Sequence, residues 1–276
     1  MAQTCGYAGR ILKVDLSSRT SETVSSGPYQ RFIGGRGFAA RLYWEEVPPE
    51  TGALSERNRL VFAVGPLAGV PVIGGSRWGI YGKSPYRTPE TFNYGNLGGR
   101  WGAELKFAGY DALVVHGRSD RPTCLVIRDD AVDFADASGL WGRGAPQTRE
   151  ALKEDHGSDV RVVAIGPAGE NRVSTASLLA DNDASGSAGL GSVMGSKNLK
   201  AVVVRGTRRK TSVAQPERLK HLSDYLRSFN RGAFTAWGTD FVQTGPKVKR
   251  DPCFGCSAKC IRIKYTADDG TSGKRA

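Results

Sequence analysis

Apolar and polar residues follow each other along the first part of the chain in patterns that predict short strands and helices. Residues 9–24 alternate around a Ser-Ser-Arg-Thr turn, which predicts a β-hairpin. Residues 29–44 carry apolar side chains close to a 3.6-residue spacing, which predicts a helix stopped by Pro48-Pro49. We then expect a strand at 60–64, a stretch rich in Gly and Pro at 65–102, a helix at 103–108 and a buried strand at 112–116.

The same order of elements is predicted a second time, with a hairpin at 123–128 and 131–135, a helix at 145–154 and strands at 160–165 and 199–204. Similar residues recur at separations that fall from 107 to 89: Gly35-Arg36-Gly37 with Gly142-Arg143-Gly144, Gly65-Pro66 with Gly166-Pro167, Leu105-Lys106 with Leu199-Lys200, and Val115-His116-Gly117 with Val204-Arg205-Gly206. This self-similarity predicts an α+β domain over residues 1–206. Its two pseudo-twofold-related repeats, each a β-sheet with helices, span about 9–117 and 118–206 and leave a cleft between them.

The segment after residue 206 has a different character. Residues 215–229 have the pattern of an amphipathic helix, and the rest is polar and basic. Residues 207–276 contain few large aliphatic side chains, too few for a core of their own. We interpret them as the beginning of a second, helical domain that is truncated in this chain.

Composition narrows the class of protein. Apolar content and charge density are ordinary for a globular chain, which argues against disordered and fibrous proteins. No apolar run approaches the roughly 18 residues of a membrane span, and no signal peptide is recognisable, so we expect a cytoplasmic protein without a membrane anchor. The 36 glycines among 276 residues are about twice the usual share and point to tight turns or close approach to a ligand.

The net charge of +12 is concentrated at one end of the chain. From Arg205 onward there are 16 Lys or Arg against 6 Asp or Glu, and the remainder is nearly neutral. Such a tail suits a nucleic acid, an acidic protein or a neutralising segment of the missing part. Since no aromatic-rich basic motif accompanies it, we do not favour nucleic-acid binding.

Three of the five cysteines lie within eight residues, at Cys253, Cys256 and Cys260. Three thiolates this close suit a [4Fe–4S] cluster or a structural zinc, and each needs a fourth ligand that the chain does not display. Zinc sites more often use separated pairs or histidine, so the cluster is the favoured reading.

Three glycine-rich stretches are the other candidates for chemistry: Gly74-Gly75-Ser76-Arg77, residues 94–99 and residues 185–191. Consecutive amides in such loops can cradle a phosphate, and Arg77 can pair with it. Each stretch taken singly is also compatible with an ordinary turn between strands.

Several motifs together resemble the aldehyde ferredoxin oxidoreductase family of tungsten enzymes. They are Gly6-Tyr7-Ala8-Gly9-Arg10, Gly34-Gly35-Arg36-Gly37, Gly65-Pro66-Leu67, residues 102–111, Gly166-Pro167-Ala168-Gly169-Glu170-Asn171 and Gly195-Ser196-Lys197-Asn198-Leu199-Lys200. The likeness covers residues 6–206, and the cysteine motif resembles the start of the family's C-terminal part.

The resemblance implies that the domain is the base for a tungsten or molybdenum bis-pterin (bis-molybdopterin) cofactor whose phosphates are joined by Mg²⁺. Carried over by motif, Arg77, Asn96, Gly98, Ala184 and Gly186 would contact the pterins and phosphates. Many members have two arginines where this chain has Asp183 and Ser187. We include both in the site, although the loss of two positive charges puts cofactor affinity in doubt.

The resemblance also implies that Cys253, Cys256 and Cys260 bind the [4Fe–4S] cluster, with a fourth cysteine further on. It implies oxidation of aldehydes to carboxylic acids, with ferredoxin as the electron acceptor and a homodimer or a complementing C-terminal chain as partner. The catalytic residues are unknown and expected in the missing part. The alternatives are a non-catalytic pterin-binding module or degenerate fragment, and a zinc-stabilised basic binding protein.

Overall fold

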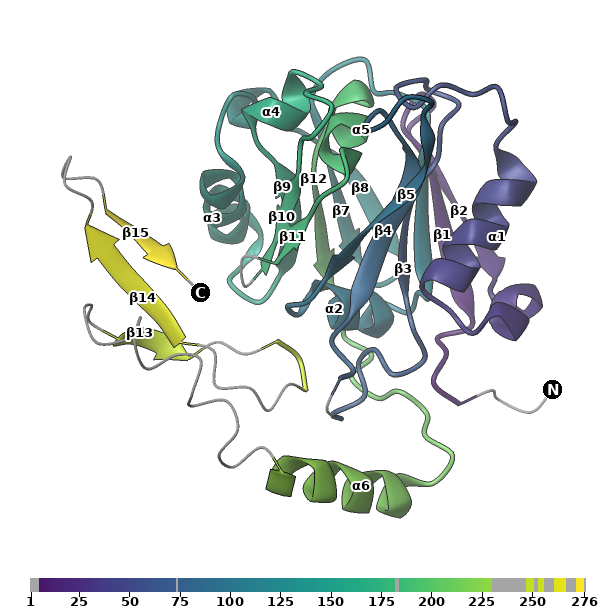
Figure 1. The fold of residues 1–276 in the computed structure, drawn as a ribbon, viewed down its shortest axis with the longest axis vertical. Coiled ribbons are helices and arrows are strands. Elements are labelled where there is room, and N and C mark those ends of the chain that lie inside the picture. The colour runs from purple at the N-terminus through teal and green to yellow at the C-terminus, as the bar shows by residue number, and fades with distance from the viewer. Residues whose placement is uncertain are drawn as a thin grey trace.

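The computed structural model describes residues 5–72, 74–181, 184–229, 247–250, 253–255, 261–266 and 272–275. Two six-stranded sheets form the body of this part of the chain (Figure 1). In spatial order the first sheet contains β2 (Thr20–Ser25), β1 (Arg10–Asp15), β6 (Ala112–His116), β3 (Leu60–Val64), β4 (Trp78–Ser84) and β5 (Thr91–Leu97). The second contains β8 (Ala131–Asp136), β7 (Thr123–Arg128), β12 (Leu199–Arg205), β9 (Arg161–Ile165), β10 (Leu178–Ala180) and β11 (Ser185–Gly186).

The two sheets have the same strand order when corresponding strands are compared. Each begins with an antiparallel hairpin, β1–β2 or β7–β8. The first strand of that hairpin pairs in parallel with the last strand of its repeat, β6 or β12. The other neighbours in each sheet are antiparallel. The expected α+β fold of two sheet-and-helix repeats is confirmed.

Helices lie on both outer faces and between the sheets. Their bounds are η1 (Gly27–Phe32), α1 (Arg36–Glu46), α2 (Trp101–Phe107), η2 (Ser138–Leu140), α3 (Ala145–His156), α4 (Pro167–Glu170), α5 (Leu190–Ser196) and α6 (Pro216–Phe229). Figure 1 shows α1 outside the first sheet and α3 outside the second, and α2 and α5 each contact strands of both sheets.

The largest hydrophobic cluster fills the space between the sheets. It combines Phe62, Trp78 and Trp101 from the first repeat with Val163 and Val202 from the second. The indole Nε1 of Trp101 donates to the carbonyl of Val202 over 3.2 Å, which satisfies the one polar atom of a fully buried ring. The two repeats therefore share one core.

The stretch rich in Gly and Pro at 65–102, for which no strand was predicted, contains β4 and β5. Glycines inside these strands hid the pattern, and each has a close neighbour where a Cβ would lie. A Cβ on Gly79 would lie 2.2 Å from the Tyr81 hydroxyl, and one on Gly82 would lie 2.6 Å from the carbonyl of Arg59. A Cβ on Gly95 would lie 3.1 Å from the Cα of Gly186.

The single helix expected at 29–44 is divided into η1 and α1. Ile33, Gly34 and Gly35 between them all have positive φ, at 70°, 147° and 50°. Residues in that region cannot continue a right-handed helix, so the chain turns before α1 begins. The expected stop is confirmed, since α1 ends at Glu46, just before the two prolines.

The match of Leu105-Lys106 with Leu199-Lys200 is also wrong. Lys106 lies in α2, whereas Lys200 lies in β12. Both lysines are buried and each is paired with a carboxylate. The two sequences are alike, but the two lysines do not occupy equivalent positions in the repeats. The helix of the second repeat that precedes its last strand is α5, which the apolar pattern did not reveal.

Residues 206–212, here called the strap, follow the second repeat but bind the first. The amide of Gly206 donates to Glu104 and that of Arg208 to the carbonyl of Phe107, each over 3.0 Å. The carbonyl of Ser212 accepts from the amide of Gly6 over 2.8 Å. The strap thus closes the lower end of the first repeat.

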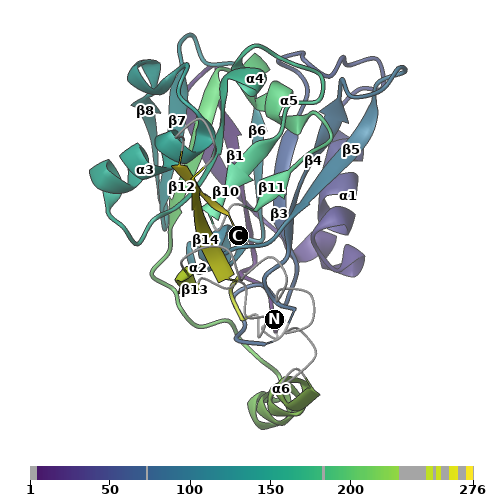
Figure 2. The ribbon, with the colours of Figure 1, turned by 60° about the vertical axis from the view of Figure 1, so that its left-hand side comes forward.

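The expected amphipathic helix is present as α6, which stands apart from the two sheets (Figure 2). Beyond it, the described residues form a three-stranded antiparallel sheet of β13 (Lys247–Arg250), β14 (Ile261–Thr266) and β15 (Ser272–Arg275), which was not expected. Among the described residues no helix is both long enough and apolar enough to pass through a bilayer.

Candidate cofactor site

Two of the predicted cofactor residues, Arg77 and Asn96, line the same cavity of about 210 Å³. Arg77 directly precedes β4, and Asn96 lies opposite Gly79 in the β4–β5 pairing. The side chains of Arg77 and Asn96 are exposed, and no described residue forms an ion pair with the one or a side-chain hydrogen bond with the other. A free guanidinium and a free amide are therefore available to a ligand at one opening.

The walls of this cavity come from chain turns as well as strands. Its remaining lining residues are Ile33, Gly34, Gly35, Ala63, Gly65, Pro66, Trp78, Gly79 and Tyr81. Many of these residues lack a side chain beyond Cα, which leaves backbone exposed to whatever occupies the space. The turn before α1 and the end of β3 meet here, since the amide of Gly35 donates to the carbonyl of Val64 over 3.0 Å.

Tyr81 is a residue of this cavity that the sequence did not suggest. It is 6% exposed, and no described residue forms a hydrogen bond with its hydroxyl. Burial raises the pKa of Tyr81 to about 12, against the opposing charge of Arg36. The hydroxyl therefore stays protonated as a hydrogen-bond donor beside Arg77 and Asn96.

The predicted residues of the third glycine stretch lie against the same strand, β5. A Cβ on Gly95 would lie 3.1 Å from the Cα of Gly186 and 3.3 Å from the amide nitrogen of Ser187. A Cβ on Gly186 would lie 3.1 Å from Leu97. The edge strands of the two sheets, β5 and β11, therefore meet through glycines, which brings Gly186 and Ser187 next to the strand that carries Asn96.

Asp181 anchors the base of that third stretch, a role the sequence analysis missed. One carboxylate oxygen accepts from the amide of Val162 over 2.8 Å, and the other accepts from the Lys153 ammonium. Just beyond it, the carbonyl of Ala184 accepts from the amide of Ala180 over 2.8 Å. Asp183 lies outside the described residues.

Cys253 is placed at the turn that follows β5. Its sulfur is 3.0 Å from the amide nitrogen of Gly99, which donates to it, and a Cβ on Gly98 would lie 3.0 Å from the same sulfur. Gly98 and Cys253, predicted for different cofactors, are thus in contact. Cys256 and Cys260 lie outside the described residues, and within the described part no three His, Cys, Asp or Glu side chains are grouped as a metal site.

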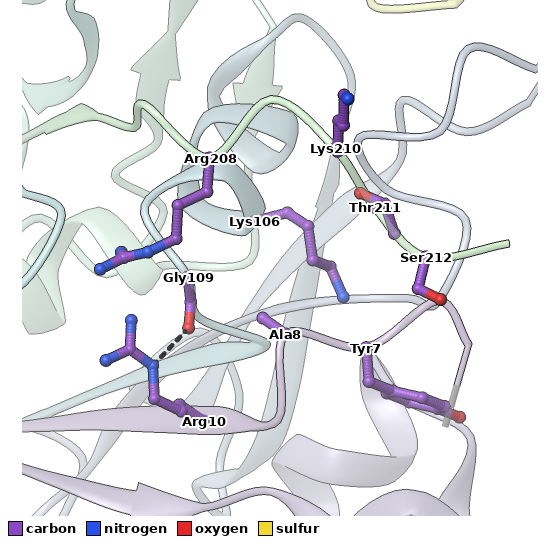
Figure 3. Close-up of a pocket in the computed structure, with 9 residues that line it drawn as sticks. All are labelled: Tyr7, Ala8, Arg10, Lys106, Gly109, Arg208, Lys210, Thr211 and Ser212. Carbon is purple, nitrogen blue, oxygen red and sulfur yellow. Dashed lines mark hydrogen bonds between the residues drawn. The ribbon is translucent and has the colours of Figure 1, made fainter. Parts of the chain in front are cut away.

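A second cavity of about 320 Å³ is lined by many cations (Figure 3). It lies between the N-terminal residues, the end of α2 and the strap, and it is lined by Tyr7, Ala8, Arg10, Lys106, Gly109, Arg208, Lys210, Thr211 and Ser212. Arg10 and Arg208 both pair with Asp130, and Lys106 pairs with the buried Asp111. Asp130 of the second repeat thus links Arg10 of the first repeat to Arg208 of the strap, whereas the Lys106–Asp111 pair lies within the first repeat.

Comparison with known proteins identifies the family. The sequence model of the aldehyde ferredoxin oxidoreductase N-terminal domain matches residues 11–206. This chain belongs to the aldehyde ferredoxin oxidoreductase family. A tungsten-containing aldehyde ferredoxin oxidoreductase of Pyrococcus abyssi is 34% identical, over 96% of this chain and 50% of the relative. One from Thermococcus kodakarensis is 42% identical, over 74% of this chain and 34% of the relative.

The fold of this family member is also found in a solved structure. The active site complex BamBC of benzoyl coenzyme A reductase, bound to 1,5-dienoyl-CoA, matches with a TM-score of 0.85 and 30% identity. The match covers 99% of this chain and 49% of that chain. The chain spans about half the length of the curated relatives it matches, which are tungsten-containing oxidoreductases.

The expected family is therefore confirmed, and the structure gathers most of its predicted site. Arg77, Asn96, Gly98, Gly186 and Ser187 all lie at or next to the end of β5. Their contacts with a cofactor stay predictions. Tyr81 and Asp181 were found only in the structure, because Tyr81 lies in a glycine-rich strand that the sequence pattern did not reveal and Asp181 lies in what resembles an ordinary turn.

Proposed function

We propose that this chain is the cofactor-binding base of an aldehyde:ferredoxin oxidoreductase. The observation that carries the proposal is the meeting of the two repeats at Gly95 and Gly186, beside Arg77, Asn96 and Cys253. When bound, a tungsten or molybdenum bis-pterin centre supplies two-electron oxygen transfer, and a [4Fe–4S] cluster supplies one-electron steps.

The residues of the base fit a large, flat, anionic group. Gly98 and Gly186 are buried glycines: a Cβ on Gly98 would meet the Cys253 sulfur and one on Gly186 would meet Leu97, so these positions let segments of the protein pack closely beside the proposed site. The Arg77 guanidinium, which forms no ion pair with a described residue, would neutralise phosphate, while Asn96 and the Tyr81 hydroxyl would offer hydrogen-bond donors to a polar ring edge. Ala184 and Ser187 extend the contact surface into the second repeat.

Asp183 and Ser187 are the two positions where the charge balance differs from the family pattern. A carboxylate facing a phosphate is repulsive unless a cation lies between them, so Mg²⁺ at Asp183 is part of the proposal. We assign no catalytic residue within this chain.

Cys253 fits a cluster ligand because its sulfur already accepts a backbone N–H hydrogen bond, as ligating thiolates commonly do. In the proposal Cys256 and Cys260 supply two further thiolates, and the fourth ligand comes from outside this chain. Electrons would then leave toward ferredoxin, through a surface completed by a partner copy or a complementing chain.

Oxidation of an aldehyde to its acid is the proposed reaction of the complete enzyme. A second reaction class, reduction of an aromatic CoA thioester, is favoured by the fold match with the benzoyl coenzyme A reductase complex. Another relative, from Pyrococcus furiosus, is named an aliphatic sulfonate oxidoreductase subunit. Because one base occurs with such different substrates, we assign substrate choice to the part of the enzyme beyond it.

The test is to purify the chain anaerobically from cells supplied with tungstate and molybdate and to measure its metals by elemental mass spectrometry. We expect tungsten or molybdenum close to one per chain, and a several-fold loss in a variant with Arg77→Ala and Asn96→Ala. Gly139→Ala is the matched control, because a Cβ there meets nothing within 4 Å. Zinc near one per chain without tungsten or molybdenum would contradict the proposal and favour the zinc-stabilised alternative.

A further inference from the structure

The segment that carries Cys253 is held to the first repeat by two hydrogen bonds of opposite direction. The amide of Gly99 donates to the Cys253 sulfur over 3.0 Å, and the amide of Phe254 donates back to the carbonyl of Gly99 over 3.0 Å. A reciprocal pair of this kind fixes both the distance and the orientation of the segment. The sulfur therefore has one defined place on the turn after β5.

Packing on either side holds the same segment. The Phe254 ring meets the Phe107 ring edge-on, with centroids 5.6 Å apart and planes at 74°. Gly255 has a φ of +66°, and a Cβ there would lie 2.5 Å from the carbonyl oxygen of Val72. The segment therefore approaches the backbone so closely that only glycine fits at residue 255.

Gly98 provides the space that the sulfur fills. A Cβ on Gly98 would lie 3.0 Å from the Cys253 sulfur, closer than normal van der Waals contact, and 3.8 Å from Nη1 of Arg77. Gly98 does not have a positive φ, so the backbone alone does not demand glycine here. The position is left without a side chain because the sulfur occupies its place.

We propose that Gly98 and Gly99 form a positioning turn for the Cys253 sulfur, in which Gly99 donates the hydrogen bond and Gly98 leaves the gap. The inference rests on the proposed function, in which Cys253 is a cluster ligand. It adds that the turn directly after β5, the strand that carries Asn96 of the proposed pterin site, holds the first cluster sulfur. Hydrogen bonds to ligating sulfurs set the potential of a cluster, so the turn also tunes electron transfer.

Disulfide trapping tests the placement directly. An S–S bond of about 2.04 Å puts each sulfur about 3 Å from the opposite Cβ, which is the separation found here. We would introduce Gly98→Cys into the full 276-residue chain carrying Cys256→Ser and Cys260→Ser, purified without metal. Oxidised glutathione accepts the two electrons and two protons released when the two thiols join.

We expect most chains to form the disulfide between residues 98 and 253, identified by peptide mass mapping. Gly139→Cys in the same background is the matched control, because this exposed glycine has nothing within 4 Å of a Cβ. It should join Cys253 at least tenfold more slowly. Equal rates for the two variants would overturn the proposal.

A second measurement does not depend on the folding of that variant. The chain is labelled with [¹⁵N]glycine, and exchange of the Gly99 amide with solvent is followed by NMR. Loss of one hydrogen bond should raise this exchange roughly five- to tenfold in Cys253→Ala, and Cys256→Ala should leave it unchanged. An unchanged rate in Cys253→Ala would overturn the assignment of Gly99 as donor.

The iron content of the chain is then measured as well, so that the positioning turn and the proposed function can be contradicted separately. Iron near four per chain together with no disulfide between residues 98 and 253 would support the proposed cluster and contradict the positioning turn. A clear disulfide in a chain that never retains iron would support the positioning turn and contradict the proposed cluster. In the loaded enzyme, Gly98→Ala should shift the midpoint potential and the EPR signal of the cluster, while Gly139→Ala should leave both in place.

Discussion

Single side chains decide how the two repeats stay joined, and Lys197 is the clearest case. It is fully buried, donates to the carbonyls of Glu56 and Gly117 over 3.2 Å each, and has no described carboxylate within ion-pair distance. Burial, helped by the charge of Arg59, lowers the pKa of Lys197 from 10.5 to about 7. This lysine ties the end of α5 to two loops of the first repeat.

The lowered pKa predicts a pH dependence of stability. Between about pH 7 and pH 10.5 the unfolded chain binds this proton and the native state does not, so the free energy of unfolding rises with pH in that window. In Lys197→Met this contribution disappears. Urea unfolding, followed by tryptophan fluorescence, measures the free energy of unfolding of both proteins. In the wild type it should rise by roughly 1 kcal/mol per pH unit relative to the variant. The exposed Lys220→Met should show no such trend.

The buried ion pair of Lys106 and Asp111 predicts strong coupling between its members. Asp111 also accepts from the amides of Ala8 and Gly9 and from the Ser26 hydroxyl. Lys106→Met alone should lower the free energy of unfolding by about 3–5 kcal/mol because it leaves a buried charge unpaired. In the double variant with Asp111→Asn, the loss should be smaller than the sum of the two single losses. Strict additivity in this double-mutant cycle, measured by urea unfolding, would contradict the coupling.

At the scale of elements, short helices cross each other through glycine. Helix α5 packs on α4, and a Cβ on Gly195 would lie 1.9 Å from the carbonyl oxygen of Gly169. The neighbouring atom is backbone, so it cannot move aside as a flexible side chain would. The spacing of these two helices is therefore set by the absence of a methyl group.

This crossing predicts a large cost for Gly195→Ala. Although alanine favours a helix more than glycine does, the clash should lower the free energy of unfolding by roughly 2–4 kcal/mol. Gly139→Ala, with open space around its Cβ, should change it by less than about 0.5 kcal/mol. Thermal unfolding by circular dichroism compares the two, and equal melting temperatures would show that α4 and α5 can separate without cost.

For the whole molecule, the sequence predicted the repeat and the class of fold better than the elements near the site. Strands such as β3 and β6 are continuous apolar runs and were found, whereas β4 and β5 were missed because Gly79, Gly82 and Gly95 replace the expected side chains. These glycines make room for neighbours that come together only in the folded chain, so a local sequence pattern cannot reveal them. Tyr81 and Asp181 were missed for the same reason.

Part of the positive charge of the basic tail is paired within the folded chain. Arg208 pairs with Asp129 and Asp130, and Arg209 with the buried Glu104, so the first positive charges after the repeats are neutralised within the protein. This part of the tail acts as an internal fastening. The charge available for an external partner is correspondingly smaller than the composition suggests.

The strap predicts where the chain can be shortened. A chain ending at Val213 keeps the strap but loses α6, which stands apart from the sheets (Figure 2), and the contacts of residues 253–255 with the first repeat, so it is the reference for this test. A chain ending at Arg205 loses the partners of Glu104, Phe107 and Gly6, and its free energy of unfolding should fall by about 2–4 kcal/mol. Circular dichroism melts of the two chains decide, and matching curves would contradict a structural role for the strap.

The hydrogen bond between Gly6 and Ser212 has a consequence for synthesis on the ribosome. The first repeat is translated completely long before Ser212 leaves the exit tunnel, so its N-terminal residues must wait without their final partner. During that interval Glu104 lacks both Gly206 and Arg209 as neighbours. The nascent first repeat therefore reaches its final form only when the second has been made, and the two mature as one unit.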